Sequence, residues 1–327
     1  MAGTQGASSQ VPPSLPPASA SVTHADKPAT AGEPGGFTLR ADVNLVVVDV
    51  TVRSQDGEIV GDLGPESFHV FEDGIEQQIR HFSRDELPLA LALVVDASGS
   101  MGPALRQLHS VAYDTLSALK PQDRIALFEF AARPKLIVGL TRSRHAIADG
   151  IATIRAEGAT VIADALFEAA LYLRGAAPDC RHAVILVSDN DNTLQGYADE
   201  KRVIRQALES EAVIYSVRVE QGLHPHAMTV LLPIFRDVSV PRIAHETGGE
   251  VIDAKNIESM RSAMAIAVSR LKQRYSLGFY STNPHRDGGF REIEIRITEG
   301  TQDSSRYTVY ARRGYYSRKE ETPTPTP

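Results

Sequence analysis

The chain has little of several features that would reveal a chemistry at once. Its 327 residues include one cysteine, Cys180, and no tryptophan, so no disulfide can form within the chain and the redox compartment is undetermined. No run approaches the roughly eighteen consecutive apolar residues that a membrane-spanning helix needs. A formal charge of -7 argues against the basic surface that nucleic acids attract. We therefore expect neither a membrane span nor a nucleic-acid partner.

The motifs of common hydrolases and nucleotide-binding enzymes are also missing. His245-Glu246 lacks the second histidine of a zinc-protease helix. Gly99 and Gly102 are not followed by the Lys-Ser or Lys-Thr of a phosphate-binding loop, and Ser98 does not lie in a Gly-x-Ser-x-Gly elbow. We expect no enzyme. A Mg²⁺-dependent phosphohydrolase or phosphotransferase centred on Asp96 stays open as an alternative.

The most informative feature of the sequence is a predicted buried strand that is followed directly by polar residues. Residues 89–95 are an unbroken run of Leu, Ala and Val, which is typical of a strand covered on both faces of an α/β sheet. Asp96, Ser98 and Ser100 follow directly. Ligands of such sheets bind outside the carboxyl ends of the strands, and these oxygens suit a hard cation. A turn in which Asp96 caps the next helix would use the same residues.

Two further polar residues occupy positions that such a sheet would bring to the same edge. Thr160 precedes an apolar-periodic helix, and Asp189 follows a second buried run at residues 183–187. In type, order and position the set resembles the metal-ion-dependent adhesion site of von Willebrand factor A domains, over about residues 88–274. The five residues that carry this resemblance are Asp96, Ser98, Ser100, Thr160 and Asp189.

The resemblance implies a role for each residue of the set. In that family the two serines and the threonine contact the cation, while the aspartates act largely through bound water. The expected cation is Mg²⁺, with Mn²⁺ or Ca²⁺ as alternatives, and Asp191 is a possible outer-shell residue. A cation with few anionic ligands accepts a carboxylate from outside. The expected function is thus a non-enzymatic, adhesion-type module that binds an acidic residue of a partner protein; a structural cell-envelope scaffold is the alternative.

The segments on both sides of the α/β pattern have the two-residue period of β-strands. We predict one immunoglobulin-like β-sandwich, built from both segments, with the α/β domain inserted between its halves. Two separate small β units are the alternative. A hairpin turn is expected at Asp287-Gly288-Gly289. The predicted strands are 45–53, 68–71 and 76–82 before the domain, and 275–280, 290–297 and 307–311 after it.

The predicted fold class is therefore α/β, a doubly wound Rossmann-like von Willebrand factor A domain in a discontinuous immunoglobulin-like sandwich. Its sheet is expected to be mostly parallel, with one antiparallel edge strand from the hairpin at 125–140. Residues 43–50, 71–74 and 312–316 also resemble the acidobacterial VWFA-related proteins. The predicted domains are a sandwich first half (37–87), the A domain (88–271) and a sandwich second half (272–317).

The two ends and one internal stretch do not resemble packed structure. Residues 1–36 are rich in Pro, Ser and Ala, and residues 318–327 end in Thr-Pro repeats, so we expect a disordered tether and tail. The tether has no signal-peptide pattern but resembles what remains after cleavage, which favours an extracytoplasmic location. Residues 221–238 contain His224 and His226 without a third metal ligand; a sheet-covering loop and a partner contact stay open.

Overall fold

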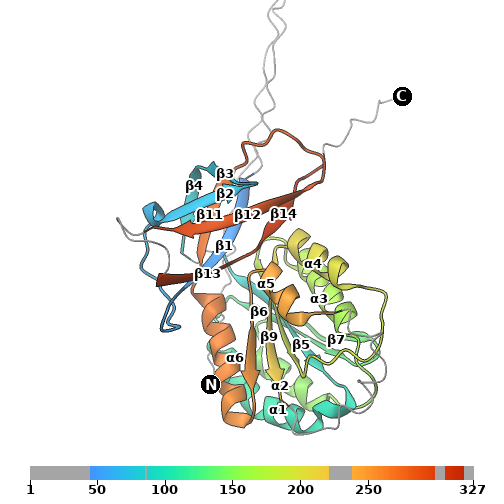
Figure 1. Ribbon diagram of the computed structural model, residues 1–327. Helices are drawn as coiled ribbons and strands as arrows, with labels where there is room; N and C mark the ends of the chain where they lie inside the picture. The colour runs from blue at the N-terminus through green and yellow to red at the C-terminus, as the bar shows by residue number, and fades with distance from the viewer. Residues whose placement is uncertain (1–44, 85–86, 221–237, 299–305, 320–327) are drawn as a thin grey trace, which may run out of the picture. The chain divides into compact units, whose positions relative to one another are not determined.

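A computed structural model describes residues 45–84, 87–220, 238–298 and 306–319. It contains one six-stranded sheet of order β10-β9-β8-β5-β6-β7 and two four-stranded sheets (Figure 1). The strands of the large sheet are β5 (Leu89–Asp96), β6 (Arg124–Phe130), β7 (Pro134–Thr141), β8 (Arg181–Ser188), β9 (Ala212–Val219) and β10 (Val251–Ala254).

The large sheet is parallel except at one edge, where β7 pairs antiparallel with β6. The predicted mostly parallel α/β sheet with an antiparallel edge strand is confirmed. Its central strand β5 is buried along its whole length. The strand order reverses at β5, with β6 on one side and β8 on the other. Side chains at the carboxyl ends of β5 and β8 therefore meet at the switch point, where open α/β sheets bind ligands.

Alternate residues of β5 enter two cores on opposite faces of this sheet (Figure 1). Leu89, Leu91 and Leu93 pack with α1, α2 and α6, whereas Ala90 and Ala92 pack with α3, α4 and α5. The two-residue period of a strand sets this division. The helices are α1 (Gly102–Ser117), α2 (Arg144–Thr153), α3 (Ile162–Ala176), α4 (Glu200–Glu209), α5 (Val240–Glu246) and α6 (Ile257–Lys272).

Each four-stranded sheet combines strands from before and after the six-stranded sheet, in the orders β13-β1-β11-β4 and β14-β12-β2-β3. Neither flanking segment forms a sheet by itself, and both contribute to one apolar core. The immunoglobulin-like class stays a prediction. The strands are β1 (Leu45–Ser54), β2 (Phe68–Glu72), β3 (Ile75–Gln77), β4 (Ile79–Ser83), β11 (Tyr275–Tyr280), β12 (Phe290–Ile297), β13 (Tyr307–Ala311) and β14 (Gly314–Tyr316), and the short 3-10 helices are η1 (Pro65–Ser67) and η2 (Gly99–Met101).

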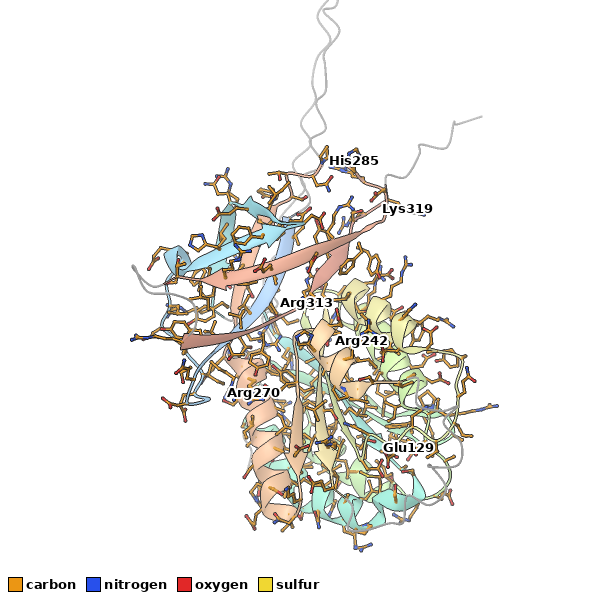
Figure 2. All side chains as sticks on the ribbon, in the orientation of Figure 1. Glu129, Arg242, Arg270, His285, Arg313 and Lys319 are labelled. Atoms are coloured by element: carbon orange, nitrogen blue, oxygen red, sulfur yellow. The ribbon has the colours of Figure 1, made fainter. Side chains whose placement is uncertain are left out.

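A shared carboxylate ties α6 to β1. Arg270, labelled in Figure 2, is buried on α6 and forms an ion pair with Glu250. Glu250 also accepts a hydrogen bond from Arg53 Nη1 of β1 at 3.1 Å. Because one carboxylate serves two guanidinium groups from different elements, it fixes both at the start of β10.

Two details of the predicted strand pattern are wrong. Residues 76–82 do not form one strand, because β3 pairs with β2 in one sheet while β4 pairs with β11 in the other. Residues 287–289 do not turn a hairpin between β11 and β12, since these strands belong to different sheets. Alternation of apolar residues identifies a strand and its buried face, but it does not say which sheet the strand joins.

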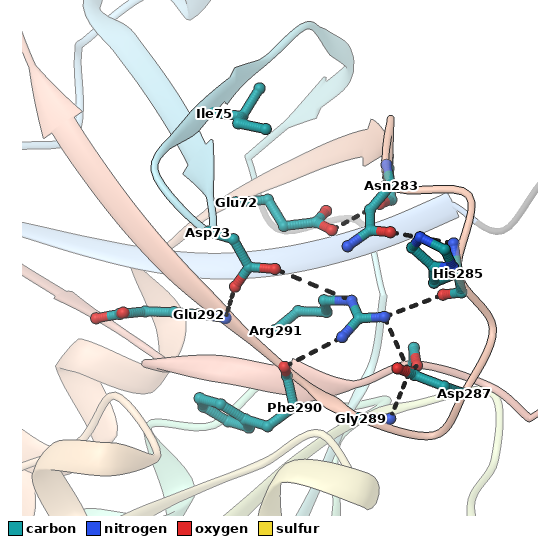
Figure 3. Close-up of polar contacts among 12 residues, drawn as sticks. Glu72, Asp73, Ile75, Asn283, His285, Asp287, Gly289, Phe290, Arg291 and Glu292 are labelled. Atoms are coloured by element: carbon teal, nitrogen blue, oxygen red, sulfur yellow. Dashed lines mark hydrogen bonds and ion pairs between the residues drawn. The ribbon is translucent and has the colours of Figure 1, made fainter.

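Asp287 instead anchors the entry to β12 (Figure 3). Its Oδ1 accepts the Gly289 N–H at 2.8 Å, the Ser317 hydroxyl at 3.0 Å and Arg291 Nη2 at 2.9 Å. These contacts, the Gly289 bond foremost, lower the pKa of Asp287 to about 2. Arg291 is buried and also donates to the His285 carbonyl at 3.0 Å. The loop before β12 therefore closes around a buried guanidinium group.

Candidate functional site

Asp96, the last residue of β5, is fully buried. Its Oδ1 accepts the Ser98 N–H at 2.8 Å and its Oδ2 accepts the Ser188 hydroxyl at 2.6 Å. The pKa of Asp96 is raised to about 6, mainly by burial; the hydrogen bonds from Ser188 and Ser98 oppose this rise, and the negative charge of Asp189 adds a smaller contribution to it. Within the described ranges no ion pair reaches Asp96. The donors that hold the carboxylate in the described part of the chain are neutral.

Two serine hydroxyls connect the loop after β5 to the end of β8. The Oγ atoms of Ser98 and Ser100 lie 3.1 Å apart, and Ser100 Oγ donates to Asp189 Oδ2 at 2.6 Å. Asp189 follows β8, which pairs with β5. The structure thus brings Asp96, Ser98, Ser100 and Asp189 into one hydrogen-bonded group at the switch point of the sheet.

Thr160 lies on the neighbouring loop, before α3, and is buried. Its N–H donates to the Thr193 hydroxyl at 2.7 Å, and its carbonyl accepts from the Thr193 and Leu194 N–H groups. Two residues earlier, the Gly158 carbonyl accepts the Gly99 N–H at 3.3 Å. These backbone contacts join the Thr160 loop to the loops that follow both β5 and β8. The five predicted residues therefore come to the same edge of the sheet.

Ser188 is a member of this group that the sequence analysis missed. It is fully buried at the end of β8, donates to Asp96 and accepts the Asn190 N–H at 3.0 Å. A hydroxyl at the end of a strand that neighbours β5 was the signal that could have found it. Asp191 is exposed, and its N–H donates to Asp189 Oδ1 at 3.1 Å. Its role as an outer-shell residue stays a prediction.

The loop after Asp189 is fixed onto the first turn of α3. The buried carboxylate of Asp164 accepts the N–H groups of Ala198 at 2.8 Å and Tyr197 at 3.3 Å. The side-chain oxygen of Asn192 accepts the Ile162 N–H at 3.0 Å, which satisfies a free donor at the helix start. Asp164 therefore holds the rim of the site in place, in addition to placing negative charge at the N-terminus of α3.

We expect Asp164→Ala to loosen this rim. The substitution leaves two N–H groups without their acceptor, at a cost of about 2 kcal/mol or more in local stability. Amide hydrogen exchange should accelerate at Tyr197 and Ala198 while the amides in the middle of α1 keep their rates. Unchanged exchange at both loop positions would show that the Asp164 contacts do not hold the loop.

The grouped residues fit a hard divalent cation. The group presents carboxylate and hydroxyl oxygens only, which are the ligands that Mg²⁺ prefers. No three His, Cys, Asp or Glu side chains gather anywhere in the described part of the chain, so a cation here would depend on the hydroxyls. Among the residues that the structure describes, no cationic side chain pairs with the buried Asp96 carboxylate, and its negative neighbour Asp189 opposes its ionisation. A cation would offset both costs.

Residues 91–192, which contain the five predicted site residues, match the family model of the von Willebrand factor type A domain. The chain contains a von Willebrand factor type A domain. An uncharacterized protein of Synechocystis sp. is 33% identical over 109 residues, which are 32% of this chain and 26% of that protein. The chain thus matches about a quarter of that relative's length.

Solved structures resemble the chain at low sequence identity. A von Willebrand factor type A protein from Catenulispora acidiphila has a TM-score of 0.47 at 10% identity, covering 86% of this chain and 76% of that one. Proximal thread matrix protein 1 from the mussel byssus, solved with a zinc-occupied MIDAS motif, has a TM-score of 0.45 at 19% identity, covering 61% and 49%. Among the described residues, no helix is long and apolar enough to cross a membrane.

Proposed function

We propose that the von Willebrand factor type A domain of this chain is a divalent-cation-dependent protein-binding module. The observation that carries the proposal is the oxygen-only, hydrogen-bonded group of Asp96, Ser98, Ser100 and Asp189 at the switch point. In this proposal Ser98, Ser100 and Thr160 hold the cation directly, and Asp96 and Asp189 act through water. Mg²⁺ is the proposed cation, with Mn²⁺ or Ca²⁺ as alternatives.

The hydrogen bonds of Asp96 support this division of roles. Both of its oxygens already accept a donor, from Ser98 N–H and Ser188 Oγ, so the carboxylate is oriented by the protein. Neutral hydroxyls as direct ligands leave most of the cation's charge uncompensated. When bound, the cation would supply a Lewis-acidic position for a carboxylate oxygen of the partner.

The surface beside the group supports a protein as partner. Leu194 and Tyr197 lie on the loop after Asp189 and are 39% and 49% exposed. Asp164 fixes this loop through Tyr197 and Ala198, so a partner would meet a preordered apolar rim around a charged centre. Exposed tyrosine side chains such as that of Tyr197 are enriched at protein interfaces. The Pro/Ser/Ala-rich residues 1–36 lie outside the described residues, and an extracytoplasmic location remains part of the proposal.

Partner capture with and without cation tests the proposal. We expect the immobilised chain to retain a partner in Mg²⁺ and to release it in EDTA. Ser100→Ala should weaken both capture and Mg²⁺ affinity measured by titration calorimetry by at least about tenfold. Ser110→Ala, an exposed serine of α1 that bonds the Gln107 carbonyl, is the matched control and should behave as wild type.

Other results of the same experiment would contradict the proposal. Partner capture that is unchanged by EDTA would favour the alternative of a structural scaffold. Mg²⁺-dependent turnover of a phosphate ester that is lost in Asp96→Ala would favour the phosphohydrolase alternative. Equal heats of Mg²⁺ binding in wild type and Ser100→Ala would show that the Ser100 hydroxyl is not a ligand of the cation.

A further inference from the structure

A cavity of about 340 Å³ lies at the other end of the six-stranded sheet from Asp96. Residues at the starts of β8 and β9 line it, together with residues of β1 and β11. Arg181, on its wall, opens β8 and pairs with Leu89 at the start of β5, whereas Asp96 ends β5. At about 3.3 Å per residue, the strand separates the cavity from the Asp96 group by about 20 Å. The two sites are therefore spatially separate.

Three largely buried guanidinium side chains and two carboxylates line this cavity. The side chains of Arg181, Arg274 and Arg312 are 9%, 6% and 9% exposed. Asp49 Oδ2 lies 4.0 Å from Arg181 Nη1 and 3.9 Å from Arg274 Nη1. Both contacts are at the limit of an ion pair, and Asp49 Oδ1 already accepts the Ser276 hydroxyl at 2.7 Å. The Asp49 carboxylate is thus shared between the guanidinium groups of Arg181 and Arg274.

Arg312 has few acceptors among the described residues. Its Nη2 donates to the Val47 carbonyl at 2.6 Å and lies 3.4 Å from Glu211 Oε1. The Glu211 side chain is 65% exposed, which weakens this pair through solvent screening. The buried Nε–H of Arg312 has no hydrogen-bond partner among the residues that the structure describes. Arg312 therefore brings to the cavity wall a positive charge that its screened pair with Glu211 offsets only in part.

We propose that this cavity binds a small organic oxyanion, a carboxylate or phosphate group on an apolar body. Guanidinium groups present paired N–H donors that match the two oxygens of such anions. Leu45, Leu87 and Val213 line the same cavity and provide contact for the apolar body. The volume lies in the range of small-molecule sites. The excess of guanidinium groups over carboxylates favours an anion over a neutral ligand.

Cys180 makes the proposal measurable, because it lines the cavity and is the only cysteine of the chain. Benzoate should slow the alkylation of Cys180 by iodoacetamide in a saturable way, and neutral benzamide of the same shape should not. Inorganic phosphate, tested separately, distinguishes a phosphate-binding from a carboxylate-binding cavity. Protection should persist in EDTA and in Asp96→Ala, which separates this site from the proposed cation site.

Two substitutions should change the affinity of the cavity for the anion in opposite directions. Arg312→Gln should weaken protection by about tenfold or more, whereas Arg313→Gln, the exposed neighbour labelled in Figure 2, should leave it unchanged. Glu211→Gln removes a negative charge from the cavity wall and should strengthen protection. A purely structural arginine cluster predicts no such gain, so this variant tests the proposal even if Arg312→Gln fails to fold. Absence of protection by both anions in wild type, or equal protection in Arg312→Gln and wild type, would overturn it.

Discussion

Asp96→Asn is expected to abolish cation binding and, in EDTA at about pH 7.5, to make the protein more stable than wild type. The opposite signs follow from one property of the side chain. Asp96 is fully buried, and its pKa is raised to about 6 mainly by that burial. Its negative charge therefore favours cation binding, but it destabilises the folded protein when no cation is bound.

The pH dependence follows from the direction of this shift. Because the folded-state pKa of Asp96 is above its ordinary value of 3.8, the folded protein binds more protons than the unfolded chain between these two values. The contribution of Asp96 to stability therefore falls as pH rises through that window. Above about pH 6 the penalty reaches about 3 kcal/mol, and a neutral asparagine avoids it. Its amide group can still accept the Ser98 N–H and donate to Ser188 Oγ.

Urea unfolding in EDTA at about pH 7.5 and about pH 4 measures this difference. Asp96→Asn should be the more stable protein at the higher pH and should lose that advantage at the lower one, where wild-type Asp96 is protonated. Mg²⁺ should raise the thermal midpoint of wild type only. If Asp96→Asn were less stable than wild type at both pH values, burial of the ionised Asp96 carboxylate would not destabilise the folded protein.

Gly248→Ala should cause one of the largest losses of stability in the chain, about 2 to 4 kcal/mol. Gly248 follows α5 with a φ of +85°, in the left-handed region where a Cβ atom is unfavourable. A Cβ there would also lie 2.7 Å from the Ala311 carbonyl carbon and 2.8 Å from the Arg312 nitrogen. Both atoms belong to the backbone, so neither can rotate away. We expect the chain between β13 and β14 to move or to lose its packing.

Gly74→Ala is the matched control for this prediction. Gly74 has a φ of +81°, almost that of Gly248, but a Cβ at this turn would have no heavy atom within 4 Å. It should therefore lose only the conformational cost of about 1 kcal/mol. Equal losses in the two variants, measured by urea unfolding, would show that the close approach to residues 311 and 312 contributes nothing.

Local sequence patterns were enough to predict the α/β part of the fold and the edge at which the predicted site residues meet. The apolar run of β5 is followed by Asp96, and that of β8 by Ser188 and Asp189. Parallel strands bring their carboxyl ends to one edge, so two local patterns were enough to place side chains that are distant in the chain. Strand periodicity likewise found the flanking strands, but it joined β3 to β4 and predicted a hairpin at Asp287.

Features that depend on burial and on contacts between distant segments could be seen only in the folded chain. It paired Ser188 with Asp96 and thereby showed a carboxylate held by neutral donors, with its pKa raised by burial. It also gathered Arg181, Arg274 and Arg312 around one cavity, although no motif links them in the sequence. The reason is physical: a local pattern reports which way a side chain faces, whereas desolvation and charge balance depend on every segment packed around it.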